Sequence, residues 1–193
     1  MPRLIATFLL LLTVSPALAN DPYCERPWFI RNLIFDRAGY CFSSALGQSV
    51  FDNSDCTGTD VALSDRDSQA VAQIRELEAW MGCKMDTGVR RLETLPELQD
   101  LRRFAVLPVP IDEGSYGCIG YLGPDLPLYT APGAITGPVM GTIRVGSSIL
   151  FEYMPERGWD FVTAYADGWK GPPSASGWLD MRFGEPECQD YAG

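Results

Sequence analysis

Hydrophobic residues recur at helical spacing between Ser64 and Gly82. Ser64 can cap the start of a helix, and the acidic residues after it match the positive end of the helix dipole. Gly82 can end the helix. The apolar positions fall on one helical face: Val71, Ile74, Leu77, Trp80 and Met81. This pattern predicts a helix whose apolar face packs in a core.

An earlier part of the chain has a similar pattern. In the segment 28–37 the helical spacing places Trp28, Arg31 or Asn32, and Phe35 on one face, and Gly39 supplies the left-handed residue that ends a helix. A short second helix, capped by Ser43 or Ser44, is expected to end near Phe51. Residues 20–83 are therefore predicted to form a small helical domain.

The segment 84–112 is predicted to be a connector that contains one short helix. The sequence of residues 94–97 predicts a capping box with proline in the first turn. Leu98, Leu101 and Phe104 then share a face, which we expect to pack onto a neighbouring domain of the same chain. The proline-rich stretch that follows is expected to be stiff and extended.

From residue 113 to the end, the pattern changes to short aromatic and β-branched runs separated by glycine and proline turns. Such a pattern predicts a small antiparallel β-barrel. The expected strands lie within residues 118–122, 126–133, 138–143, 146–153, 158–162 and 177–180. The predicted fold class is α + β, with a disulfide-bonded helical domain followed by an SH3-like barrel.

Residues 1–19 have the pattern of a secretory signal peptide. Arg3 precedes an apolar run, Leu4–Val14, that is too short to span a bilayer, and the run is followed by small residues up to Ala19. We expect cleavage after Ala19 and a soluble mature protein that is periplasmic or secreted.

Six cysteines follow the predicted signal, an even number that suggests three disulfides in an oxidising compartment. Six cysteines allow 15 pairings. The simplest partition places two bridges in the helical domain and one in the barrel. The expected pairs are Cys24–Cys83, Cys41–Cys56 and Cys118–Cys188.

Composition argues against several classes of function. The formal net charge is −10, and removal of Arg3 with the signal leaves 14 basic and 25 acidic residues, or −11. Such a charge repels nucleic acid and anionic membrane surfaces. The sequence has no histidine, no Cys-x-x-Cys pair and no glycine-rich phosphate loop. We therefore expect no enzymatic activity, no cofactor and no metal site; the acidic loop 52–60 lacks the spacing of a calcium loop.

The segment Trp28–Phe42 resembles the YARHG family, a small exported bacterial helical domain named after its motif. The tyrosine of the motif falls on Phe35, its arginine on Arg37 and its glycine on Gly39. Its histidine position is Ala38, which is a departure. The resemblance implies an extracytoplasmic domain and no established chemistry.

The order of runs and turns after residue 126 is similar to the bacterial Src-homology-3 type (SH3b-like) domain. It departs in the insertion 165–176, which is longer than a tight hairpin. Domains of this kind bind proline-rich or cell-wall peptides, and the resemblance implies a ligand of that class here.

The barrel has more aromatic residues than its core alone needs, which favours a binding groove. Trp178 and Tyr153 are expected in the core. The candidate ligand-binding residues are Tyr129, Trp159 and Trp169, with Asp160 and Asp167 as acceptors for a cationic or amide group.

The leading hypothesis is an exported, non-catalytic envelope protein that binds a peptidoglycan peptide or a periplasmic protein. One alternative is a disulfide-stabilised structural or inhibitor-like protein without a groove. Exposed Trp159 and Trp169 would favour the first over the second. A second alternative is an envelope hydrolase that uses two converging carboxylates.

Overall fold

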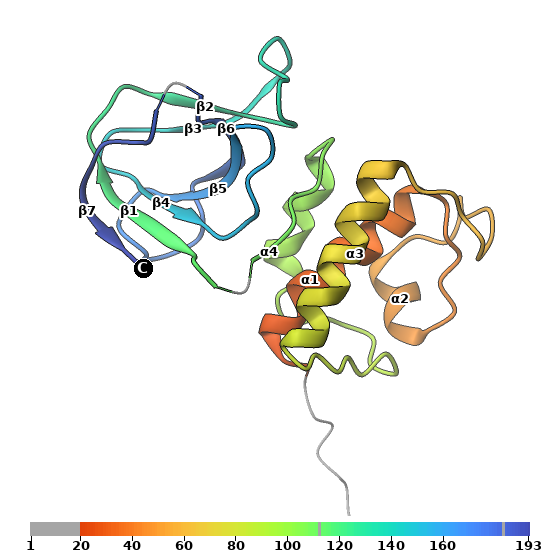
Figure 1. Ribbon diagram of the computed structural model, residues 1–193. Helices are drawn as coiled ribbons and strands as arrows, with labels where there is room; N and C mark the ends of the chain where they lie inside the picture. The colour runs from red at the N-terminus through yellow and green to blue at the C-terminus, as the bar shows by residue number, and fades with distance from the viewer. Residues whose placement is uncertain (1–19, 112, 183) are drawn as a thin grey trace, which may run out of the picture.

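The computed structural model describes residues 20–111, 113–182 and 184–193. The predicted signal peptide, residues 1–19, lies outside the described residues. The chain forms a helical part and a sheet, with a short helical connector between them (Figure 1). No helix among the described residues is long and apolar enough to cross a membrane.

The helical part follows the sequence pattern, with one correction. Its described helices are α1 (Pro22–Arg37), α2 (Ala45–Val50) and α3 (Asp65–Trp80). The helix α1 begins earlier than the expected segment because the Asp21 side chain accepts a hydrogen bond from the Tyr23 N–H. Pro22 fits the first turn, where its missing N–H has no helical partner to lose. The Ser64 side chain caps α3 as predicted. Trp80 was expected in the core but is 63% exposed, because the buried face of α3 is formed by Ala70, Val71, Ile74 and Leu77.

The six cysteines pair as expected. The bridges are Cys24–Cys83, Cys41–Cys56 and Cys118–Cys188. The first joins the start of α1 to the turn after α3, so it fixes two antiparallel helices at one end. The third closes a long loop around the sheet, with a sequence separation of 70 residues.

The second part of the chain is an antiparallel sheet of seven strands. The strands are β1 (Tyr116–Tyr121), β2 (Leu126–Tyr129), β3 (Val139–Ile143), β4 (Ser148–Phe151), β5 (Trp159–Tyr165), β6 (Ala175–Asp180) and β7 (Cys188–Ala192). Their order is β3-β2-β6-β5-β4-β1-β7, so the described sheet has two ends and is not a closed barrel. It curves strongly, and the loop between β2 and β3 projects from it (Figure 1). β7 pairs with β1 and has no counterpart among the expected strands.

Two hydrophobic clusters hold the structure together. The smaller lies on the inner face of the sheet and includes Leu128, Ile149 and Val162. The larger runs from the helical part through the connector to the opposite face of the sheet, where it includes Phe161 and Trp178. The two parts of the chain therefore share a core, and Trp178 and Tyr153 lie in it as expected.

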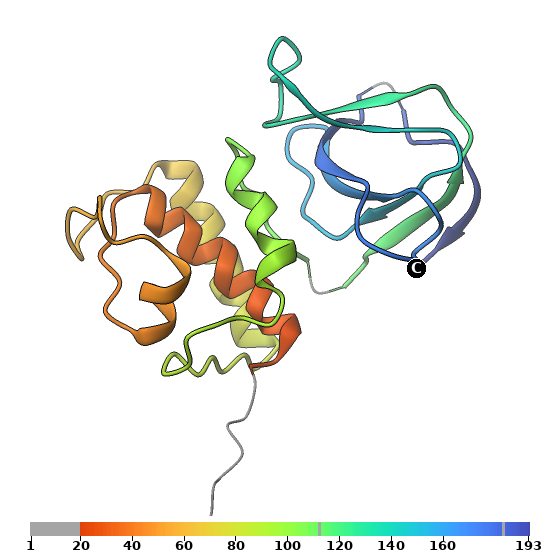
Figure 2. The same ribbon diagram turned by 180° about the vertical axis from the view of Figure 1, so that it is seen from behind.

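The connector is packed rather than a free spacer. It consists of α4 (Leu95–Leu98), the 3-10 helix η1 (Gln99–Arg103) and the extended stretch after it. Both ribbon views show α4 between α1 and the sheet (Figures 1 and 2). The extended stretch bonds to the sheet, because the N–H of Val106 donates to the carbonyl of Thr130 and the N–H of Met154 donates to that of Val109.

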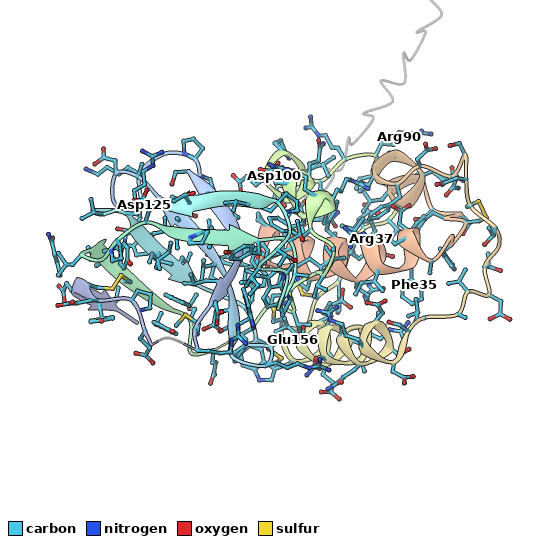
Figure 3. All side chains as sticks on the ribbon, turned by 90° about the horizontal axis from the view of Figure 1, so that it is seen from above. Phe35, Arg37, Arg90, Asp100, Asp125 and Glu156 are labelled. Atoms are coloured by element: carbon cyan, nitrogen blue, oxygen red, sulfur yellow. A yellow bond between two sulfur atoms is a disulfide. The ribbon has the colours of Figure 1, made fainter. Side chains whose placement is uncertain are left out.

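Ion pairs also cross from the helical part to the sheet. Nη2 of Arg66 lies 2.8 Å from the Glu156 carboxylate and also donates to the carbonyl of Leu107. Figure 3 shows Glu156 at this junction. Arg26 forms a second pair with Glu152 at 3.1 Å. These contacts fix the sheet relative to the helices at several points.

Candidate functional site

A hollow of about 540 Å³ opens on the sheet between the start of β2 and the end of β6. We call it the β2–β6 groove. Five segments line it: the end of β1 with the loop into β2, β2 itself, the β2–β3 loop, the end of β6, and the loop before β7. Its lining residues are Tyr121, Gly123, Pro124, Leu126, Pro127, Tyr129, Ile135, Leu179, Asp180, Arg182, Gly184, Glu185, Pro186 and Glu187.

The groove exists because β2 and β6 pair over a very short length. Their register consists of Tyr129 opposite Trp178. Beyond that pair β2 continues with Pro127, which has no N–H to extend a ladder. The strands separate from there toward Leu126 and Asp180, and the space between them is the groove.

The floor of the groove is apolar. Leu126, Pro127 and Leu179 line it together with the ring of Tyr129. Ile135, in the projecting β2–β3 loop, is 55% exposed although it is a large apolar side chain. A concave surface with an apolar floor and a few polar groups around it is typical of a ligand site.

Tyr121 shapes the wall formed by the loop into β2. Its ring is buried, and its hydroxyl donates to the carbonyl of Pro124 at 2.8 Å. Burial raises the pKa of this phenol, and the neighbouring Asp125 raises it further. A Cβ at Gly123 would collide with the Tyr121 hydroxyl, so this turn requires glycine. Figure 3 shows Asp125 on the sheet, away from the helical part.

The opposite wall carries charge. Arg182 forms a two-pronged pair with Asp180, with Nε–Oδ1 and Nη2–Oδ2 distances of 2.8 and 2.6 Å. These hydrogen bonds lower the pKa of the Asp180 carboxyl. The guanidinium also lies over the ring of Trp159, 5.3 Å from its centroid. Glu185 and Glu187 are exposed on the same wall, and neither has a cationic partner within the described residues.

A group of polar residues lies beside the Glu185 end of the groove. Asp160 is opposite Leu179 in the sheet register and is partly buried. Burial raises the pKa of the Asp160 carboxyl, and the charge of Glu185 raises it further. Tyr116 stacks on Phe151 with ring centroids 4.3 Å apart. Burial raises the pKa of Tyr116 to about 12, with smaller contributions from Asp160 and Glu185.

The structure separates the five candidate residues that the sequence suggested. Tyr129 lines the groove, and Trp159 lies directly behind it, with ring centroids 5.8 Å apart. Trp159 is 2% exposed, so it supports Tyr129 instead of offering its own surface, contrary to expectation. Its burial follows from the larger cluster, which covers the outer face of β5. Asp160 lies next to Glu185, beyond the groove lining.

The other two candidates lie elsewhere. Trp169 is 41% exposed but packs edge-on against Tyr165 and over Gly117, where a Cβ would meet the indole at 2.6 Å. Asp167 pairs with Trp169 in the same loop. Neither residue lines the β2–β6 groove. The insertion 165–176 therefore covers β1 and does not form a lip of this groove.

Sequence reasoning missed the loop that forms the charged wall. The segment Gly184-Glu-Pro-Glu187 contains two acids around a proline, a pattern that indicates a turn but no particular position in space. The floor residues Leu126 and Pro127 were visible as part of a strand. That they face an opening depends on where β2 leaves β6, which the sequence does not reveal.

A second hollow, of about 440 Å³, lies in the helical part around Arg37 and Gly39. Nη2 of Arg37 donates to the carbonyls of Arg102 and Phe104 at 3.1 and 2.8 Å. Burial lowers the pKa of this guanidinium. Gly39 has φ +87°, and a Cβ there would meet Thr57 Oγ1 at 2.7 Å. Both residues therefore have structural roles. Arg37 holds the connector through these hydrogen bonds, and Gly39 permits the left-handed turn beside Thr57.

The second hollow offers few free donors. The Arg102 guanidinium donates to the carbonyl of Val50 and lies over the rings of Phe29 and Phe51. Ala38, at the histidine position of the YARHG motif, contributes only a methyl group. Within the described residues no group of three or more Asp, Glu or Cys side chains is placed to hold a metal ion.

Comparison with protein families divides the chain in two. The YARHG domain model matches residues 4–79 and confirms the resemblance in the first part. A second model, described as a domain of unknown function (DUF4453), matches residues 82–193, more than half of the chain. It takes in the connector as well as the sheet. No curated protein and no solved structure matches the chain. The disulfides and the YARHG domain indicate an extracellular or periplasmic protein.

Proposed function

Because the chain belongs to the family described as a domain of unknown function (DUF4453), we propose its function from the geometry of the groove. The protein is an exported, non-catalytic binding module of the cell envelope. Its β2–β6 groove holds an extended peptide, supplied either by the cell wall or by a periplasmic protein.

The observation that carries this proposal is the separation of β2 from β6. It leaves an opening with an apolar floor and polar walls, about 540 Å³ in volume. An extended peptide places alternate side chains on one side, so some can cover Leu126 and Tyr129 while others reach the walls. Small-molecule sites have a similar volume. The exposed Ile135 in the β2–β3 loop offers an extended peptide a further apolar contact.

The rest of the molecule supports a rigid binding platform. Trp159 backs Tyr129, and Arg182 is held by Asp180 and by the Trp159 ring. A groove whose side chains are already fixed loses little conformational entropy when a ligand binds. The chain has no histidine, the most frequent general base, which favours binding over catalysis.

We also propose that the sheet is a variant of the SH3-like fold. The consecutive hairpins of β4, β5 and β6 support this, as do β1 beside β4 and β7 beside β1. In this assignment β2 and β3 form a long hairpin inserted after the first strand. The groove then lies between that hairpin and the end of the meander.

The experiment compares two sources of the peptide. The oxidised protein without residues 1–19 is mixed with isolated peptidoglycan sacculi in one arm, and with an immobilised library of about twelve-residue peptides in the other. The variant Ile135→Ser removes an exposed groove side chain and is expected to fold normally. Trp169→Ala is the control, since Trp169 is exposed outside the groove.

We expect specific retention in one arm, weakened in Ile135→Ser and unchanged in Trp169→Ala. Retention in the sacculus arm assigns the wall as the source, and retention in the library arm assigns a protein. Retention that is equal in all three proteins, or retention in neither arm, contradicts the proposal.

A further inference from the structure

We infer that the occupant of the β2–β6 groove is a cationic segment of a protein. Along the side of this segment that faces the groove, apolar side chains alternate with lysine or arginine. This inference rests on the proposed peptide-binding function and names the class of peptide. It follows from the charges around the groove, taken together with the apolar floor.

The groove lining contains three acidic side chains and one basic one. Asp180, Glu185 and Glu187 are the acids, and Arg182 is the base. Arg182 is committed to Asp180 through two hydrogen bonds and rests on the Trp159 ring. Its charge is therefore matched locally. Glu185 and Glu187 remain as uncompensated charges on the wall.

The surroundings add to the negative field. Asp160 lies near Glu185 and has no cationic partner within the described residues. Asp125 is exposed on the loop that forms the other wall. A peptide in the groove therefore passes beside the carboxylates of Glu185 and Glu187, above a floor of Leu126 and Tyr129.

Two tyrosines flank the acidic end. Tyr116 is 37% exposed, and Tyr191 is 57% exposed with its hydroxyl bonded to the carbonyl of Pro186. Aromatic faces next to carboxylates suit an ammonium or guanidinium group, because both the rings and the acids attract a cation. Burial, and then the charge of Glu185, raise the pKa of the Asp160 carboxyl, so its ionised form is disfavoured. A bound cation would relieve that cost.

The charge pattern also favours a protein over the cell wall as the source of the peptide. An acidic peptide, including a wall peptide whose carboxylates outnumber its amines, would meet repulsion from Glu185 and Glu187. A basic segment gains attraction in the encounter and in the bound state. The formal net charge of −10 reinforces this preference at long range.

The test uses three matched peptides made of repeats of Ser-Leu-Ser-Lys, Ser-Leu-Ser-Gln or Ser-Leu-Ser-Glu. In an extended chain leucine and the fourth residue point to the same side. Binding to the oxidised protein is measured by fluorescence anisotropy at about 0.15 M salt. The order expected is lysine over glutamine over glutamate.

Glu185→Gln should weaken the lysine peptide about five-fold and leave the glutamine peptide unchanged, as expected for one partly solvated ion pair. Glu76→Gln on α3 removes the same charge from an exposed position in the helical part and should have no effect beyond about 1.5-fold.

The outcomes separate this inference from the proposed function. Equal affinity for the three peptides, with loss in Ile135→Ser, keeps a peptide groove but overturns the cationic class. Sacculus binding that persists unchanged in Glu185→Gln, without lysine-peptide binding, reassigns the occupant to the wall and also overturns it. Binding of no peptide and no sacculi removes both ideas.

Discussion

The indole Nε1 of Trp178 donates a hydrogen bond to the main-chain carbonyl of Val106, at 2.9 Å. Trp178 belongs to β6 and is 1% exposed, whereas Val106 belongs to the connector. The same Trp178 is the residue opposite Tyr129 in the pairing of β2 with β6. One side chain thus joins the connector, the sheet and the strand pair at which the groove begins.

Replacement of Trp178 by phenylalanine should destabilise the fold by about 2 kcal/mol, because the partly buried Val106 carbonyl loses its donor and the smaller ring fills less of the core. Urea unfolding of the oxidised protein measures this loss. Trp80→Phe is the control, since Trp80 is 63% exposed, and it should change the free energy of unfolding by less than about 0.5 kcal/mol. An equal loss of unfolding free energy in both variants would contradict a stabilising role for the hydrogen bond from Trp178 to Val106.

Arg37 should matter for the attachment of the connector. Arg37→Met keeps the aliphatic stem but removes the donors to the carbonyls of Arg102 and Phe104; because Arg37 is itself solvent-exposed, we expect a loss of about 1 kcal/mol in urea unfolding. Arg90→Met is the matched control, because Arg90 is exposed (Figure 3). A loss no larger than that of the control contradicts the structural role of this arginine in the YARHG motif.

Stability should fall at alkaline pH because of Tyr153. Burial raises the pKa of this phenol to about 12 from its ordinary value near 10. A raised pKa means that the unfolded chain ionises first, so the stabilisation is full below pH 10 and is lost between pH 10 and pH 12. The loss should be of order 2–3 kcal/mol.

The variant Tyr153→Phe isolates this effect. It cannot ionise at residue 153, so its unfolding free energy should fall less steeply over the same interval. Chemical unfolding at a series of pH values gives both slopes. Identical slopes in the two proteins would contradict the assignment to Tyr153.

The ionised carboxylate of Asp160 should lower the free energy of unfolding of the protein at neutral pH. Burial and then the charge of Glu185 raise the pKa of its carboxyl. The native state therefore favours the protonated acid, and stability is lost as pH rises through the folded-state pKa. Asp160→Asn should raise the melting temperature at pH 7, with the gain disappearing in acid below the unfolded pKa of about 4.

The same variant should bind the lysine peptide less tightly, although it is more stable. Such opposed effects are typical of a residue kept for binding and not for folding. Asp190→Asn, on the exposed strand β7, is the control and should change neither quantity measurably. Lower stability of Asp160→Asn at pH 7 would contradict the pKa argument.

Much of the fold was predictable because its determinants are local. The stripe from Val71 to Leu77, the cap at Ser64 and the stop at Gly82 lie within one segment and specify α3. The division of the chain into two parts gave the pair Cys118–Cys188, whereas Cys24–Cys83 with Cys41–Cys56 was one choice among the three pairings that four cysteines allow. β7 was missed because Cys188–Ala192 has no apolar alternation, and its place in the sheet comes from pairing with β1.

The site was less predictable because it depends on contacts between distant segments. Trp159 was expected at the surface since the barrel alone has too many aromatic residues to bury. That count left out the helical part, whose cluster buries the outer face of the sheet. The β2–β6 groove depends on the place where Tyr129 leaves Trp178, and on a loop that returns Glu185 to the opposite wall.

The most direct test of the binding account is a map of amide chemical shifts in the ¹⁵N-labelled, oxidised protein as the Ser-Leu-Ser-Lys peptide is added. We predict saturable changes in 121–129 and 179–182 and at Glu185 and Glu187, with little change around Trp169 or Arg37. Saturable changes centred on Trp169 or on the helical part, with the groove residues unmoved, would contradict the central claim.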